Sequence, residues 1–284
     1  MELRDRTGSL GARMWNITEQ SVANVTAGEF AHARGKVQLF QGGLQVILTH
    51  IVPVSPEGLD LTEFLPQPKQ DAAKYMTRLQ EILLSLDDPA IRMLMQCFID
   101  DRELMEKFSL APAGTKTHHA YQGGLLEHVT TMLEIGTRIG PLYPDLKLDV
   151  LLAGIFLHDL GKVRELSYDC GFGYTSEGQL LGHMMIGVEM LAEKIRDYEV
   201  RMEQPFPTET MLRLKHIIIS HHGSYEFGSM KLPMTPEAIA LHHIDNLDAK
   251  LHEFMRDIQN DPNPGSDWTP FSTRLDRKLY KGAR

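Results

Sequence analysis

The chain has 284 residues, which is enough for one large domain or two ordinary ones. Its hydrophobic share of 42% allows a packed core and excludes a wholly disordered chain. The 29 basic and 38 acidic residues give a net charge of −9, which argues against a broad electrostatic grip on nucleic acid. A nucleic-acid substrate stays open, because bound divalent cations would reverse the charge locally.

The cysteine content and the first residues concern the compartment. Two cysteines, Cys97 and Cys170, are too few for a disulfide framework or a thiolate metal cluster, which fits a reducing cytoplasm. The N-terminus is charged early and has no apolar stretch of the kind found in signal peptides. No run of about 18 apolar residues occurs, so we expect a cytoplasmic protein that does not span a membrane.

Residues 1–66 are expected to form a small β domain. Residues 4–15 alternate as in a β-hairpin, and residues 35–54 form a second candidate hairpin around a Gly-Gly loop. Short strands of this kind suggest a small barrel or part of one. Two prolines in residues 65–68 then mark the expected domain boundary.

Residues 67–260 are expected to contain helices only, because apolar residues recur there at helical spacing. The irregular segment 109–122 is long enough to suggest a functional loop. Residues 261–284 are expected to form a tail packed on the helical domain. Helix starts are predicted at residues 72, 89, 123, 149, 176, 209 and 236, with caps at Asp88, at Ser176 with Gln179, at Thr208 and at Thr235.

The helix predicted at residues 149–159 ends in an unusual way. It is apolar on nearly every side, as in a helix buried in a core, and its last residues are His158 and Asp159. A charged pair at such a place is costly unless it is compensated. A bound cation would compensate it, so this pair predicts a metal site.

Histidines gather in the same part of the chain. Of the 13 histidines, only His32 and His50 lie outside residues 118–252. Several sit among large apolar neighbours, so the helices are expected to point them inward. A single histidine of this kind is more often a satisfied core residue than a ligand, but the group favours a divalent transition metal held by imidazole and carboxylate. The candidates are His128, His158, Asp159, His183, His221, His222 and Asp245.

The order H…HD…D of His128, His158-Asp159 and Asp245 resembles the signature of the HD-domain metal-dependent phosphohydrolases. The closer resemblance is to the YhaM-type 3′→5′ exoribonucleases, which join an N-terminal OB fold to an HD domain. It covers nearly the whole chain, and stretches such as SLAPAGTKTHHAYQGGLLEHV and LLAGIFLHDLGKVREL carry it. The resemblance implies a two-domain α+β fold, in which the OB-like barrel lacks its first strand.

The resemblance also implies a ligand set for two divalent metal ions, with manganese favoured and iron as the alternative. The first ion would be held by His128, His158, Asp159 and Asp245. Asp159 would bridge to the second ion, with His183 and His221 as further ligands. His222 would either ligate or contact the phosphate. Two cations about 3.5–4 Å apart would generate a hydroxide and clamp the attacking and leaving oxygens.

Three further groups are candidates for contact with the substrate. Lys162 could neutralise a phosphate oxygen, although a solvated helix-end lysine is an equal alternative. His119 lies in the irregular loop, and the resemblance suggests a substrate-facing role for it. Trp15 and Phe40 could stack on bases, as aromatic residues of OB folds do. For Trp15, we consider a place in the barrel core the better interpretation.

The expected activity is removal of nucleotides from the 3′ end of single-stranded RNA, or DNA, with release of 5′-mononucleotides. The first alternative is the same chemistry on a small or cyclic nucleotide. Gly124 disfavours cyclic dinucleotides, because some HD-domain relatives that open them have a glutamate at that position. A di-iron oxygenase and a non-catalytic RNA-binding module are the remaining alternatives. Association into a homo-oligomer is left open.

Overall fold

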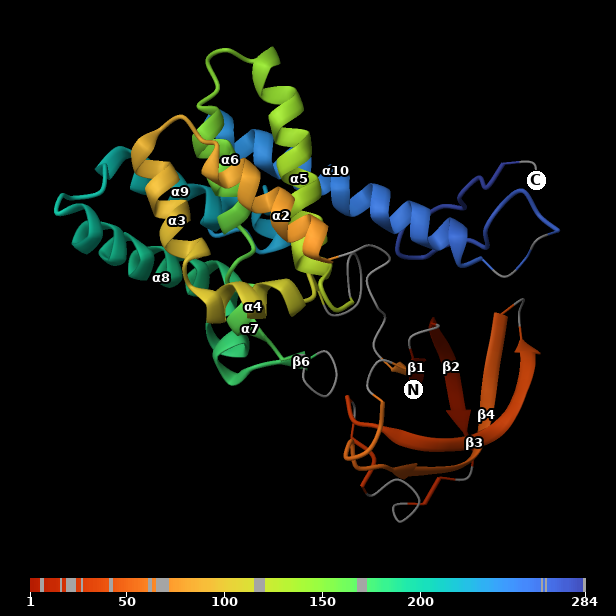
Figure 1. Ribbon diagram of the computed structural model, residues 1–284. Helices are drawn as coiled ribbons and strands as arrows, with labels where there is room; N and C mark the ends of the chain where they lie inside the picture. Colours follow the sequence, from red (N-terminus) through yellow and green to blue (C-terminus); the bar gives the residue numbers. More distant parts are fainter. Residues whose placement is uncertain are drawn as a thin grey trace.

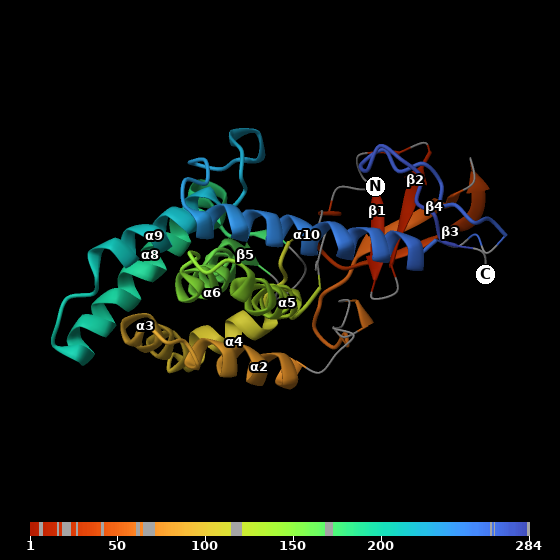
Figure 2. The same cartoon turned by 90° about the horizontal axis from the view of Figure 1, so that it is seen from above.

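A computed structural model shows a curled β-sheet followed by a helical domain (Figure 1). The last long helix, α10, leads from the helical domain toward the sheet, and both views show it there (Figures 1 and 2). The structure describes residues 1–5, 8–15, 17–18, 24–26, 28–40, 43–60, 63–64, 72–114, 121–167, 173–261, 263 and 265–282.

Four strands form the N-terminal sheet in the order β1-β2-β4-β3. β1 and β2 are antiparallel, β2 and β4 are parallel, and β3 and β4 are antiparallel, so both predicted hairpins are confirmed. Ala12, Val46, Leu48 and Ile51 form a small apolar core of this sheet. The strand bounds are β1 Glu2–Asp5, β2 Gly8–Met14, β3 Ala31–Phe40 and β4 Gly43–Pro53.

The sheet forms an open half-barrel, which agrees with the expected OB-like fold. β1 and β3 are its two edges, and among the described residues no strand joins them. An OB fold is a five-stranded barrel, so a further strand would belong between these edges. The expected burial of Trp15 is wrong: its side chain follows β2 and is 63% exposed. Phe40, at the end of β3, is exposed as well.

The helical domain packs around one large apolar core. The helices begin close to the predicted residues because their apolar residues keep the 3.6-residue period. Their bounds are α2 Ala72–Leu84, α3 Pro89–Ile99, α4 Arg102–Leu110, α5 Gly124–Ile139, α6 Leu148–Leu157, α7 Lys162–Glu165, α8 Ser176–Met202, α9 Thr208–Ser220 and α10 Pro236–Gln259, with 3₁₀ turns η2 Gly140–Leu142 and η3 Tyr225–Phe227.

Local details differ from the expected all-helical pattern. A two-stranded sheet, β5 (Leu166–Ser167) and β6 (Gly173–Tyr174), lies between α7 and α8. Asp88 and Thr235 cap α3 and α10 as predicted. The cap of α8 is Thr175 rather than Ser176, because the Thr175 hydroxyl accepts the N–H of Gly178. Pro207, not Thr208, precedes α9.

The expected boundary at residues 65–68 lies outside the described residues, so the division into 1–66, 67–260 and 261–284 stays a prediction. The sheet and the helices have separate cores. After α10 the chain folds back, with Leu275 and Leu279 buried and Arg274 paired with Glu253 and Asp257 of α10. None of the described helices combines the length and the apolar character needed to cross a membrane.

Candidate metal centre

Helix α6 places the His158-Asp159 pair inside the helical domain. Every residue from Val150 to Leu157 is buried, so α6 runs through the core between α3, α5, α9 and α10. His158 is the C-terminal cap of α6, and Asp159 follows in the turn. Their exposed fractions are 0% and 2%, so the pair lies inside the domain as the sequence predicts.

Asp159 lies at the centre of a histidine cluster, and its two oxygens face different partners. Oδ2 is 3.4 Å from Nε2 of His158 and 3.9 Å from Nε2 of His128 on α5. Oδ1 is 3.6 Å from Nε2 of His183 on α8 and 3.6 Å from Nε2 of His221 after α9. Segments far apart in the sequence thus converge on one carboxylate.

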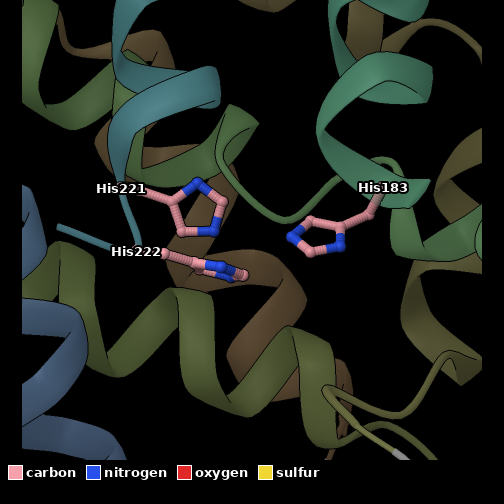
Figure 3. Close-up of side chains that lie close together, drawn as sticks. All are labelled: His183, His221 and His222. Atoms are coloured by element: carbon pink, nitrogen blue, oxygen red, sulfur yellow. The ribbon is translucent and has the colours of Figure 1, made fainter. Parts of the chain in front are cut away.

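The side chains form two groups with metal-ligand spacing. The first contains His128, His158 and Asp245, whose His128 Nε2 to Asp245 Oδ1 distance is 3.3 Å. The second contains His183, His221 and His222. In Figure 3 the ring of His183 points across from its helix toward the rings of His221 and His222. Within each group the candidate ligand atoms all lie within 4.8 Å of one another.

Each imidazole is oriented by a partner at its Nδ1 atom. A partner there holds the ring and leaves Nε2 directed at the cluster, as is usual for metal-ligating histidines. The partners are Asp248 for His128 at 2.7 Å, the Ile155 carbonyl for His158 at 2.7 Å, the Ile218 carbonyl for His221 at 2.8 Å, the Phe227 carbonyl for His222 at 2.7 Å and Glu165 for His183 at 3.3 Å.

Buried polar atoms at the centre test whether the cluster fits a metal. Nε2 of His158, His183 and His221 have no hydrogen-bond partner among the residues that the structure describes, and neither has Oδ1 of Asp159. Buried polar atoms are normally paired, because leaving them unpaired costs free energy. Imidazole and carboxylate donors aimed at one another in this way fit divalent cations.

At Asp159 and His221 the electrostatics favour the protonation states that ligation needs. At His128, in contrast, burial is outweighed by the hydrogen bonds with Asp245 and Asp248, which raise the pKa to about 10. Burial raises the pKa of Asp159, but the charges of Lys162 and His158 outweigh it and hold this pKa well below its ordinary value. Burial, assisted by His158, lowers the pKa of His221 well below its ordinary value. Near neutral pH, Asp159 is therefore anionic and His221 is neutral.

Lys162 is part of the site rather than a solvated helix-end residue. Its Nζ donates to Oδ2 of Asp159 at 2.6 Å and to the carbonyl of Ala113 at 2.6 Å. Its side chain is 13% exposed, so the solvated alternative is wrong. The ammonium group of Lys162 therefore places a positive charge beside Asp159 in the cluster.

Gly161 permits the close approach of the His158-Asp159 turn to α8. A Cβ atom at Gly161 would lie 2.0 Å from the carbonyl oxygen of His183 and 2.8 Å from the nitrogen of Gly187. Real Cβ contacts are never that short, so any side chain would push α8 away. The glycine therefore keeps His183 within reach of Asp159.

The candidate substrate contacts are not all in one place. His222 is partly buried beside His221, with ring centroids 4.4 Å apart. Trp15 follows β2 and Phe40 ends β3 of the N-terminal sheet, and the guanidinium of Arg13 lies 5.6 Å from the centroid of the Phe40 ring. His119 falls outside the described residues.

Sequence reasoning missed a residue beside the cluster. Around the candidate ligands, Asp248 contacts the ring of His128, and His242 Nδ1 lies 2.9 Å from the His221 carbonyl. Glu165 was not foreseen, although its carboxylate contacts His183. Its position in the charged stretch KVREL resembles a solvated helix face, so no local signal marks it.

Comparison with known proteins agrees with this geometry. Residues 125–250, which contain all the candidate metal ligands, match the family model described as "HD domain". Residues 125–250 are thus an HD domain, a class that depends on divalent metal ions. Sequence relatives extend the match over nearly the whole chain.

Two curated relatives carry the name 3′-5′ exoribonuclease YhaM. That of Shouchella clausii is 36% identical over 284 residues, covering 98% of this chain and 85% of its own length. That of Bacillus subtilis is 35% identical over 283 residues, covering 98% of this chain and 86% of its own length. The chain belongs to the YhaM family. The search of solved structures found no match.

Proposed function

We propose that this chain is a metal-dependent exoribonuclease that shortens single-stranded RNA from its 3′ end and releases 5′-mononucleotides. The proposal is carried by the arrangement around Asp159, whose two oxygens face two separate groups of histidines. Family membership supports the substrate class, since the curated relatives are named 3′-5′ exoribonucleases. The absence of a membrane-crossing helix among the described residues and the low cysteine content are compatible with the cytoplasm.

Two divalent ions are assigned to the two groups. Asp159 would be shared between them. The carboxylate donors suit manganese, which is the first choice, and the imidazole donors suit iron, which is the second. The first ion would be held by His128, His158 and Asp245, and the second by His183 and His221 with His222 as a further ligand or phosphate contact.

The bound cations would supply Lewis-acid activation of water and neutralise charge on the phosphodiester. The protein would supply position and charge around them. Lys162, held by Asp159 and Ala113, would place its ammonium beside the phosphate. His222 is held by the Phe227 carbonyl through Nδ1, which leaves Nε2 for the phosphate or the second ion. His119 remains a predicted substrate contact.

The N-terminal half-barrel would hold the RNA upstream of its 3′ end. Trp15 is exposed, and Arg13 lies against the exposed ring of Phe40. Exposed aromatic rings accompanied by arginine bind single strands through stacking and cation–π contacts. In this assignment residues 1–66 bind RNA, residues 67–260 carry the chemistry, and residues 261–284 form a tail on the HD domain.

The first test is a gel time course with a 5′-labelled RNA that has an unpaired 3′ tail. With manganese, we expect a ladder that shortens from the 3′ end; with a chelator, the RNA should stay intact. A DNA of the same sequence in parallel separates RNA preference from DNA preference. The variant Asp159→Asn controls for a contaminating nuclease.

Two outcomes would contradict the proposal. If wild-type protein with bound manganese leaves every oligonucleotide intact but hydrolyses a small nucleotide, the substrate class is wrong. If it consumes oxygen and releases no phosphate ester product, the reaction class is wrong.

A further inference from the structure

Helix α8 is interrupted immediately before His183. Gly182 has φ 72° and ψ 157°, a conformation essentially restricted to glycine, so α8 consists of two segments and His183 begins the second. The first N–H groups of a helical segment have no partner within it. The main-chain N–H of His183 instead donates to Oε1 of Glu165, at 3.1 Å.

The same carboxylate also contacts the imidazole of His183. Nδ1 of His183 lies 3.3 Å from Oε1 and 3.3 Å from Oε2 of Glu165. One buried carboxylate therefore holds both the main chain and the side chain of His183. With Nδ1 held in this way, Nε2 faces Oδ1 of Asp159 at 3.6 Å.

Glu165 is itself fixed by its surroundings. Its carbonyl oxygen accepts the N–H of Thr175 at 2.9 Å, which joins α7 to the start of α8. A Cβ atom at Gly178 would lie 2.2 Å from that same oxygen, so the backbones are in direct contact. Only 8% of Glu165 is exposed, so its carboxylate has little freedom to move.

The histidines of the second group differ in their dependence on side chains. His221 and His222 are oriented by main-chain carbonyls, which no substitution of a side chain removes. His183 alone of these three is oriented by a side chain. A carboxylate partner also makes the imidazole a stronger donor, and losing such a partner typically lowers metal affinity roughly 10- to 100-fold.

We propose that Glu165 is a positioning residue for the second metal ion: it fixes the backbone break and the ring of His183, and thereby sets the affinity of that site without contacting the ion. This inference rests on the proposed two-metal function. It predicts that a change at Glu165 affects the second metal site and not the first, because in the described contacts Glu165 touches no residue of the first group.

Manganese binding to the metal-free full chain tests this inference without using RNA. We expect wild type to bind two ions per chain, measured by titration calorimetry, and to give the spin-coupled signal of a manganese pair in electron paramagnetic resonance. In Glu165→Ala, the second affinity should fall roughly 10- to 100-fold and the coupled signal should weaken, while the first affinity is retained. Glu165→Gln keeps an acceptor oxygen without the charge and should show a smaller loss.

Two further variants serve as matched controls. Glu177→Ala removes a neighbouring carboxylate that pairs with Arg164, and should leave both affinities unchanged. Asp248→Ala removes the partner of His128 and should weaken the first site instead.

A purely structural role for Glu165 predicts a lower Tm with both manganese affinities unchanged, and that result would overturn the inference. If Glu165→Ala does not fold, wild-type affinities in Glu165→Gln would overturn it equally. Wild type that binds two ions but leaves RNA intact would contradict the proposed function and leave the role of Glu165 standing. Wild type that binds fewer than two ions overturns both.

Discussion

Asp159 shows how one residue can link two ligand groups. Its Oδ2 lies near His158, and its Oδ1 lies near both His183 and His221. A carboxylate can serve two cations at once only if each oxygen has its own surroundings, and the convergence of α5, α6, α8 and α9 provides that arrangement. Lys162 balances part of the negative charge from one side.

Replacing Asp159 and Asp245 by asparagine separates a shared ligand from a single-site ligand. Asp159→Asn removes the charge common to both groups, so we expect weakened binding of both manganese ions and a fall in RNA hydrolysis of at least about 100-fold. Asp245→Asn should weaken only the first ion, because Asp245 lies in the first group. Calorimetric titration measures the affinities for the two manganese ions in each variant. If the two variants lose the same affinities, Asp159 is not a ligand shared between the two groups.

The candidate ligands could be predicted because of their neighbours. His128, His158 and His221 each sit in a run of large apolar residues, and all three are buried. Glu165 could not be predicted in the same way, since its contact with His183 depends on how α7 meets α8 across the backbone break. For Trp15, a place in the barrel core was the better interpretation, yet on the half-open barrel its side chain is exposed.

At the scale of elements, the course of α8 decides where His183 lies. A straight helix would carry this residue along the same axis as residues 176–181. The backbone at Gly182 instead starts a new segment, and Gly161 lets that segment contact the turn after Asp159. Two glycines thus set the position of His183 through the backbone.

Gly182→Ala tests the importance of this break. A side chain at φ 72° is strained by about 1–3 kcal/mol, and continuing the helix would relieve the strain by turning His183 away from Asp159. We expect weaker binding of the second manganese ion and a lower Tm. The matched control is Gly173→Ala, where an added Cβ would meet nothing within 4 Å. Unchanged binding in Gly182→Ala would show that the break does not orient His183.

Periodicity predicted the helices better than it predicted their ends. Apolar spacing fixes which face of a helix is buried. The cap depends on which of two adjacent polar residues lies just outside the helix and accepts one of its free N–H groups. Thr175 and Ser176 are both acceptable caps, and Thr175 takes the role since its main chain also bonds to Glu165. Strands β5 and β6 are each only two residues long, which is too short for an alternating pattern to be recognised in the sequence.

At the scale of the whole molecule, chemistry and RNA binding are assigned to separate bodies. The histidine cluster lies within the helical domain, while the exposed aromatic residues Trp15 and Phe40 lie on the half-barrel. Strand pairing confirmed the predicted hairpins, since alternation and the glycine loop define them locally. The openness of the barrel follows from the strand order, which no local pattern encodes.

Removal of the exposed aromatic rings tests this division. Stacking contributes about 1–3 kcal/mol per base, so Trp15→Ala and Phe40→Ala should each raise KM for a long RNA roughly 5- to 150-fold. Hydrolysis of a dinucleotide and manganese binding should not change. Tyr143→Ala, which removes an exposed aromatic ring from the helical domain, is the control. If the dinucleotide is affected as strongly as the long RNA, the rings do not act through strand binding.

Helix α10 leads from the helical domain toward the half-barrel. It carries Asp245 in its first half and ends at Gln259. Burial lowers the pKa of Arg4 in β1 against the charge of Glu2, and the charge of Arg256 near the end of α10 lowers it further, so this end of the helix lies near the half-barrel. At 1.5 Å per residue, the stretch from Asp245 to Gln259 measures about 21 Å. On the proposed roles, the length of α10 sets the distance between the metal site and the RNA-binding half-barrel. An RNA too short to span this distance is held at one end only, so digestion should slow at a remnant of several nucleotides whose length the helix sets.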